Sequence, residues 1–225
     1  NVINEIKQNF NENNSNFFEA HLLLALDSFK KKNYKKGKNH LQKSYAFIDN
    51  DRISLIIAET LKQYFHFFEK NEIPNTRKEF GKFSFINEVF QRCYLNDKNI
   101  KTYFESLVNS ESDKDYSRYI FFYLNYLIEN DRYKEAKTIT DDLDYLNSSL
   151  LVAQAKYWIE DQSLKNFKKV FSCKNPGDII GEVFFLVANL YSTQGDYERS
   201  NFYLNVSHYL NPKFIFNLSL LVDNY

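Results

Sequence analysis

The sequence predicts an all-α protein in which antiparallel helix pairs stack side by side into a superhelix. Two observations support this fold class. The 225 residues include only 5 Gly and 3 Pro, too few for the many turns of a β-sandwich or barrel. Apolar side chains recur at helical spacing in segments of about 11–18 residues, separated by short polar breaks. A dozen short helices cannot easily surround one spherical core, whereas a row of helix pairs can bury each apolar face against the next pair.

The breaks that delimit the helices contain Asn, Asp or Ser, whose short side chains can accept hydrogen bonds from the first turn of a helix. In chain order they are 13–16, 32–33, 50–51, 71–76, 96–97, 109–115, 130–131, 147, 161–162, 175–178, 195–196 and 211–212. Between them, 53–68 and 77–94 read as helices that lack a repeat signature. Residues 213–224 read as one last helix.

The clearest repeat unit covers residues 184–212. Its small residues Ala188 and Ser200 would lie where two helices cross, so that the backbones can approach closely. Gly195 fits a left-handed turn after the first helix, and Asp196 can cap the second helix. The full pattern is Phe184, Val187, Ala188, Tyr191, Gly195, Asp196, Tyr197, Ser200, Leu204, Ser207 and Pro212.

Two further units repeat this order at a regular interval. Their turn tyrosines, Tyr34 and Tyr133, precede Tyr197 by 163 and 64 residues and are 99 residues apart, close to whole multiples of a ~34-residue repeat. The units are Ile120, Tyr123, Leu124, Leu127, Asp131, Tyr133, Ala136 and Leu143, and Leu24, Ala25, Ser28, Asn33, Tyr34, Gly37, Leu41 and Ser44. The interval places a degenerate unit with a shortened second helix at 149–175.

This order of large and small residues resembles the tetratricopeptide repeat, W-x2-L-G-x2-Y…A-x3-F…A…P. The resemblance extends over 20–49, 118–148 and 180–212. It implies a single right-handed solenoid over 1–225, with degenerate repeats at 50–110 and 149–175. The order of units also resembles the C-terminal part of long bacterial repeat proteins, so neighbouring repeats of the same full-length chain are expected partners.

Composition excludes several classes of protein. Hydrophobic residues make up 44% and aromatic residues 18% of the chain, which is too apolar for a disordered protein. Lys and Arg number 29, as do Asp and Glu, so a net charge of zero argues against general affinity for nucleic acid. No apolar run approaches the ~20 residues of a membrane span. We therefore expect no nucleic-acid partner and no membrane span.

The termini and the cysteines give three further expectations. The chain contains no Met, which indicates a processed product or a fragment, so the compartment, cytoplasmic or periplasmic, stays open. The polar start, 1–16, is a poor cap for a helical stack and favours missing repeats upstream. Cys93 and Cys173 form neither a disulfide framework nor a metal-binding CxxC pair, so we expect two small buried hydrophobic side chains.

No constellation of catalytic residues is evident. The histidines are widely separated and belong to no metal-binding motif; they are His21, His40, His66 and His208. The acidic run 141–144 lacks the spacing of a magnesium site and reads as the solvated end of a helix. With 5 Gly, the chain has hardly a loop able to cradle a phosphate group. We predict no enzyme, no cofactor and no metal.

Lysine runs occur at 30–32, 35–38 and 165–169. Each falls at a helix turn or on one helical face, and acidic residues dilute the runs over the whole chain. Nucleic-acid binding would need the lysines in one stripe with exposed aromatic side chains between them. We read these runs as solvated faces.

The concave side of the solenoid is the better candidate for a site, because the first helix of each pair lines it. The predicted groove residues are Arg118, Phe121, Asn125, Ile128, Val152, Lys156, Glu182, Phe185, Asn189 and Ser192, and the first unit would add Glu19, Leu22 and Leu26. Phe and Asn four residues apart share one helix face. There the amide can bond the backbone of an extended peptide, and the ring offers an apolar platform. Alternatively, the phenylalanines pack between helix pairs.

The sequence therefore predicts a non-catalytic scaffold that binds a protein or peptide segment in this groove. A clamp for a C-terminal carboxylate is not supported, because Phe121 and Phe185 stand where that clamp needs basic residues. Two alternatives stay open. The chain is the helical repeat arm of a larger multidomain enzyme, such as a transferase, or it is a self-associating envelope scaffold.

Overall fold

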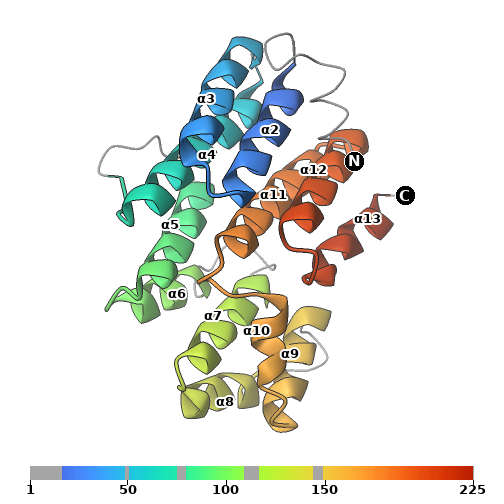
Figure 1. Cartoon of the computed structure of the whole chain (residues 1–225). Helices are drawn as coiled ribbons and strands as arrows, with labels where there is room; N and C mark the ends of the chain where they lie inside the picture. Colours follow the sequence, from blue (N-terminus) through green and yellow to red (C-terminus); the bar gives the residue numbers. More distant parts are fainter. Residues whose placement is uncertain (1–16, 49–50, 75–79, 109–116, 144–148, 225) are drawn as a thin grey trace. The chain divides into compact units, whose positions relative to one another are not determined.

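The computed structural model describes residues 17–48, 51–74, 80–108, 117–143 and 149–224 (Figure 1). All regular secondary structure in these ranges is helical, which confirms the predicted all-α class. The chain divides into two compact units, Asn1–Ser84 and Phe85–Tyr225, and each is described by itself. The single solenoid predicted over 1–225 stays a prediction, and the polar start 1–16 lies outside the described residues.

In Asn1–Ser84, three α-helices pack side by side (Figure 1). They are α2 (Phe18–Lys30), α3 (Tyr34–Ser44) and α4 (Arg52–Lys70), with a short 3-10 turn, η1 (Tyr45–Phe47), after α3. The side chain of Asn33 caps α3 by accepting from the Lys36 N–H, and Asp51 caps α4 by accepting from the Ile53 N–H. The predicted helix 53–68 is thus confirmed as α4.

Gly37 allows these three helices to approach one another. A Cβ atom at this position would lie 3.3 Å from the carbonyl oxygen of Ala25 on α2 and 3.3 Å from the ring of Phe65 on α4. The sequence pattern places Gly37 where the repeat usually has a small residue at the helix crossing, and the structure shows a close approach there. A larger residue would push the helices apart.

The remaining helices lie in Phe85–Tyr225, apart from the first residues of α5, which precede Phe85. In chain order they are α5 (Lys82–Leu95), α6 (Ile100–Val108), α7 (Ser117–Glu129), α8 (Tyr133–Asp141), α9 (Leu150–Glu160), α10 (Lys165–Val170), α11 (Pro176–Thr193), α12 (Tyr197–Leu210), η2 (Ile215–Leu218, 3-10) and α13 (Ser219–Asp223). The short helix predicted within 149–175 is present as α10, which has 6 residues, whereas the degenerate repeat unit itself stays a prediction. Asp141 and Asp142 are exposed at the end of α8, as expected for a solvated helix end.

The predicted single helix over 213–224 is wrong, because this segment is broken. Asn211 ends α12 with φ −130° and ψ 81°. Its side-chain amide donates to the carbonyl of Val170 at 2.9 Å, which holds the chain away from a helical path. Helical turns resume only at η2, and α13 that follows has 5 residues.

A left-handed residue stands in each of five short turns: between α2 and α3, α5 and α6, α7 and α8, α9 and α10, and α11 and α12. Gly195 has φ 76°, as predicted, and Asp196 caps α12 by accepting from the Arg199 N–H. The other residues at equivalent turns have φ between 54° and 59°; they are Lys32, Asn96, Asp131 and Gln162. In these pairs, a residue other than glycine takes the conformation that glycine adopts most easily.

These turns recur at a regular interval. From Asn96 to Gly195, successive left-handed turns are 35, 31 and 33 residues apart, and Lys32 precedes Asn96 by 64 residues. The intervals match one and two units of a ~34-residue repeat. The long helix α4 occupies the middle of the double interval. A left-handed turn at this interval therefore also stands between α5 and α6, where the side-chain pattern gives no repeat signature.

Helix α7 forms the centre of Phe85–Tyr225. Residues 121–128 of this helix are all buried, so it has no solvated face. The ring of Phe122 lies 4.4 Å from that of Phe171, and the ring of Phe121 lies 5.7 Å from those of Phe167 and Phe214. Side chains from several other helices and loops thus surround α7, as expected for a helix that is apolar all round.

Cys93 and Cys173 form a disulfide, with their Cα atoms 6.0 Å apart. The expectation of two separate hydrophobic side chains is therefore wrong, although both residues are buried. The bond joins the end of α5 to the loop between α10 and α11. Packing explains the pairing, because the ring of Phe90 lies 5.8 Å from that of Phe171 and so brings these two segments together.

Lys174, next to the disulfide, caps the C-terminal end of α5. Its Nζ donates to the carbonyl oxygens of Cys93 at 2.9 Å and Tyr94 at 2.7 Å, and to the side-chain oxygen of Asn96. A cation at this position satisfies carbonyls that have no partner within the helix and interacts favourably with the helix dipole. The disulfide and the ammonium group therefore fasten the same two segments.

Removing the disulfide should destabilise Phe85–Tyr225. The two cysteines are 80 residues apart in sequence, and for a loop of this length we expect the double variant C93A/C173A to lose about 4 kcal/mol of unfolding free energy. Urea unfolding of the full chain, followed by Trp158 fluorescence, measures this loss. Wild-type protein treated with a reductant should show the same loss. Two alkylatable thiols in the native, untreated chain would contradict the assignment.

Candidate functional site

The structure places three of the four predicted groove residues of α7 in the protein interior. Phe121, Asn125 and Ile128 are 0%, 1% and 8% exposed. The Asn125 amide donates to the carbonyl oxygen of Phe171 at 2.9 Å. It therefore bonds a backbone group of its own chain, and Phe121 packs among aromatic rings. These side chains are not accessible to a ligand in this conformation.

The predicted groove residues of α9 are buried as well. Val152 is 1% exposed and Lys156 is 9% exposed. The Lys156 ammonium donates to the carbonyl oxygen of Leu143, which follows α8. Of the residues predicted for the first unit, Leu22 and Leu26 are fully buried, whereas Glu19 is partly exposed.

The accessible part of the predicted groove lies on α11 and at the start of α7. Arg118, Phe185, Asn189 and Ser192 are all partly exposed. The Arg118 guanidinium lies 3.7 Å from the centre of the Phe185 ring, a cation–π contact. We call these four residues the α7–α11 face.

Glu182 lies beneath this face and is buried. Both of its carboxylate oxygens accept from Arg118, at 2.6 and 2.5 Å, in the bidentate arrangement that fits a guanidinium. Burial raises the pKa of Glu182, and the charge and hydrogen bonds of Arg118 act against that rise. The pair orients Arg118 so that its plane lies over Phe185.

The α7–α11 face is covered by the C-terminal segment of the same chain, residues 211–224. Arg118 donates to the side-chain oxygen of Asn217, whose amide donates to Ser207 on α12. Ser192 donates to the side-chain oxygen of Asn224 at 2.7 Å. The ring of Phe214 lies 5.1 Å from the Arg118 guanidinium. Asparagine amides and an aromatic ring thus hold this segment in place.

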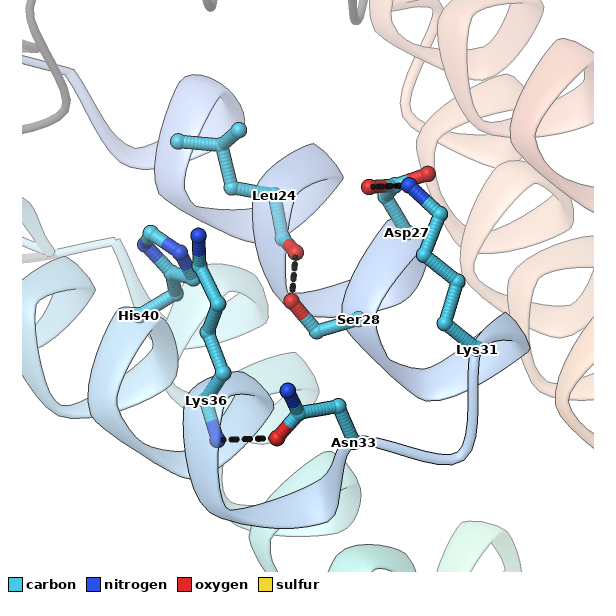
Figure 2. A pocket seen from close by; sticks show the side chains of 7 residues that line it. All are labelled: Leu24, Asp27, Ser28, Lys31, Asn33, Lys36 and His40. Carbon is cyan, nitrogen blue, oxygen red and sulfur yellow. Dashed lines mark hydrogen bonds and ion pairs between the residues drawn. The ribbon is translucent and has the colours of Figure 1, made fainter.

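A second candidate site lies in Asn1–Ser84, where α2 and α3 form a pocket of 180 Å³ (Figure 2). Its lining is polar apart from one leucine and consists of Leu24, Asp27, Ser28, Lys31, Asn33, Lys36 and His40. Within it, Asp27 pairs with Lys31 at 2.8 Å, and Ser28 donates to the carbonyl oxygen of Leu24 at 2.9 Å. A neighbouring hollow of 550 Å³ is lined by Asn33, Lys35, Lys36 and Asn39.

Sequence analysis missed this pocket because it read the lysine runs as solvated faces. The lysines of the pocket are exposed, as that interpretation requires. The composition of these lysine runs nevertheless indicated a cluster of positive charge. Residues 30–43 hold seven Lys and neither Asp nor Glu, and the short turn between α2 and α3 brings the two lysine runs to one end of the helix pair.

Two carboxyl groups with raised pKa values lie beside the disulfide. Asp178, in the first turn of α11, accepts from the Ser172 N–H at 2.9 Å, and burial raises its pKa to about 7. Burial also raises the pKa of Glu129, at the end of α7, against the effects of Ser172 and Lys168. Neighbouring carboxyl groups with shifted pKa values occur both at catalytic sites and in structural hydrogen-bond networks. Here both carboxyl groups hold the segment that carries Cys173.

The described residues show neither a metal site nor a membrane helix. Across the ranges given above, three or more His, Cys, Asp or Glu side chains nowhere gather closely enough to hold a metal ion. In the same ranges, no helix is both long and apolar enough to cross a membrane. None of the protein-family models, curated proteins or solved structures compared with the chain matches it.

The raised pKa of Asp178 predicts a pH dependence of stability. Its value of about 7 in the folded chain exceeds the ordinary 3.8, so the folded state holds a proton that the unfolded state loses. The contribution of Asp178 to the free energy of unfolding is therefore fully present below pH ~4. It is lost as the pH rises to ~7, and the loss is at most ~4 kcal/mol. D178N keeps an acceptor oxygen for Ser172 but does not ionise.

We expect D178N to match the wild type in melting temperature at pH 4 and to exceed it at pH 8. Thermal unfolding followed by circular dichroism between these pH values measures the difference. Asp223, which is exposed on α13, provides the control: D223N should leave the pH profile unchanged. Parallel profiles for D178N and wild type would contradict the assignment.

Proposed function

We propose that the chain is a non-catalytic scaffold that binds a segment of another protein on the α7–α11 face. The observation that supports this proposal is that the face already holds a segment, residues 211–224 of the same chain. The side chains of Asn217 and Asn224 and the ring of Phe214 make its contacts with the face. The sequence predicts the amide and the aromatic ring on the groove, whereas here the bound segment supplies them; the support for the proposal is that this face accommodates a segment of polypeptide.

The spacing of the left-handed turns supports a likeness to tetratricopeptide repeats. Turns 31 to 35 residues apart are what a series of helix pairs of that length requires. In such a series the first helices of neighbouring pairs lie on one side of the stack. In Phe85–Tyr225, contact between α7 and α9 agrees with this arrangement.

Self-association is a second candidate, favoured by the covering segment itself. Ile215 and Val222 are 62% and 77% exposed, so the segment presents apolar side chains on the surface that faces away from α11 and α12. A terminal segment held by one aromatic ring and a few polar contacts can exchange between two copies of a chain. A mass that rises with protein concentration in light scattering would show such exchange.

The proposal predicts that the face accepts a peptide when the covering segment is loosened. In the variant N217A/N224A, the segment loses its bonds to Arg118 and Ser192. We expect this variant to bind a fluorescent peptide of residues 211–224 about tenfold more tightly than the wild type, because one resident competitor is weakened. Fluorescence anisotropy of the full chain with this peptide measures the affinity.

Two further variants test the assignment. Adding Arg118→Gln to the loosened variant should abolish binding, since Arg118 supplies the contact to the peptide amide. Asn205, which is exposed on α12 and donates to the carbonyl oxygen of Asn201, provides a matched control, so N205A should bind like the wild type. Absence of binding to N217A/N224A while circular dichroism shows an intact fold would refute the proposed face.

A further inference from the structure

The covering segment has one buried helical face. The 3-10 turn η2 is followed directly by α13, so residues 215–223 form consecutive helical turns. Asn217 and Asn224 are buried, and Leu220 and Leu221 between them are partly buried. These four positions have the spacing i, i+3, i+4 and i+7 of a single helix face. The residues on the other side are exposed; they are Ile215, Ser219, Val222 and Asp223.

Asn217 occupies the first of two sites that bind a side-chain amide. Its oxygen accepts from the Arg118 guanidinium, and its NH₂ group donates to the Ser207 hydroxyl at 2.7 Å. Arg118 has only donors, and the Ser207 hydroxyl already donates its proton to the Gly181 carbonyl at 2.7 Å. This first amide site, Arg118 and Ser207, therefore offers a donor on one side and an acceptor on the other. A carboxamide matches both.

Asn224 occupies a second site seven residues further along the segment. Its oxygen accepts from Ser192 on α11 at 2.7 Å. Its NH₂ group donates to the Ser200 hydroxyl at 2.9 Å and to the side-chain oxygen of Asn201 at 2.7 Å, both on α12. This second amide site, Ser192, Ser200 and Asn201, again places a donor opposite acceptors. Both NH₂ hydrogens and the oxygen of the Asn224 amide are used.

Burial makes the two sites selective for an amide. Ser200 and Ser207 are fully buried, and so nearly are the asparagines that meet them. A buried polar group that loses its partner costs the free energy of its desolvation. Leucine is similar to asparagine in size but would leave the Ser207 oxygen without a donor. Hydrogen bonding therefore decides which side chain fits at each site, since size alone does not distinguish the two.

We propose that the α7–α11 face, with the adjoining residues of α12, selects a short helical protein segment that carries two asparagines seven residues apart. This inference rests on the function proposed above and adds the chemistry of the bound segment. Residues 217–224 are the resident example of such a segment. Amphipathic helices bind in grooves through anchors at i, i+3, i+4 and i+7. Here amides are the two outer anchors, and leucines are the inner ones.

Variants of the peptide of residues 211–224 test this recognition on the full chain N217A/N224A, by fluorescence anisotropy. In the peptide, Asn217→Leu and Asn224→Leu should each weaken binding about tenfold, because each removes the hydrogen bonds of one amide. Ser219→Leu lies on the exposed side and should leave the affinity unchanged. If the face recognised apolar surface alone, the first two peptides would bind at least as tightly as the parent peptide, and that result would overturn the proposal.

An insertion tests the spacing of the two asparagines. One Ala added after Leu218 of the peptide rotates Asn224 by about 100° around the helix axis and so moves it off the second amide site. We expect this insertion to weaken binding as much as Asn224→Leu does. The control is one Ala added after Asn224, which should have no effect. An affinity unchanged by the first insertion would contradict the seven-residue spacing.

Adding S192A to the chain N217A/N224A tests which site binds Asn224. With one hydrogen-bond partner removed, Asn224→Leu in the peptide should cost about threefold in affinity in place of tenfold. Asn217→Leu should still cost about tenfold, because its site does not include Ser192. Circular dichroism shows whether the variant is folded. Costs that stay the same for both peptides would overturn the assignment of Asn224 to Ser192.

The outcomes also separate this inference from the proposed function. Absence of binding by the parent peptide would overturn both. Binding of the parent peptide and of both leucine variants with equal affinity would overturn the amide recognition alone, and the face would remain a site for a protein segment. Tight binding of the parent peptide with weak binding of both leucine variants supports both proposals.

Discussion

The burial of α7 on all its sides is the constraint on which the structure of Phe85–Tyr225 depends. A helix without a polar face can be stable in water only if other elements cover it completely. Phe90 from α5, Phe167 from α10 and Phe171 from the following loop provide part of that cover. Asn125 is the buried polar residue of α7, and it finds a partner in the Phe171 carbonyl.

Two other features follow from this cover. Phe90 and Phe171 must meet beside α7, and their approach places Cys93 within reach of Cys173. Disulfides persist mainly in oxidising compartments. The covalent bond that this packing allows therefore depends on the redox state of the surroundings. Lys174 then caps α5 at the same place.

Arg118 marks the point where the buried helix reaches the surface. A buried carboxylate such as Glu182 is costly unless a cation and hydrogen bonds accompany it, and Arg118 provides both. The same guanidinium contacts Phe185 and Asn217. One side chain therefore joins the core, the α7–α11 face and the segment that covers it, which is why the proposed function depends on Arg118.

Sequence reasoning predicted what local chemistry determines. Helical periodicity located α4 and the short α10, and Gly195 with Asp196 gave the turn before α12. The repeat pattern also aligned Lys32 and Asp131 with the turn position of Gly195, and the structure shows all three in the left-handed conformation, although Lys and Asp prefer other conformations.

Tertiary packing decided the rest of the fold and of the site. Residues 119–128 are apolar or aromatic on every side except at Asn125, a pattern typical of a fully buried helix, but the repeat pattern assigned one face of this segment to a groove. Cysteines 80 residues apart give no signal of their pairing. The pocket at Asn33 and Lys36 exists because a short turn folds two lysine runs toward each other.

Hydroxyl-radical footprinting with mass spectrometry tests most directly whether α7 is a core helix and not the wall of a groove. We expect Phe121 and Phe122, which are 0% and 1% exposed, to resist oxidation. Tyr157 and Tyr197, which are 55% and 49% exposed, should be oxidised readily. Oxidation of Phe121 at the rate of these tyrosines, corrected for the intrinsic reactivity of each ring, would contradict the burial of α7.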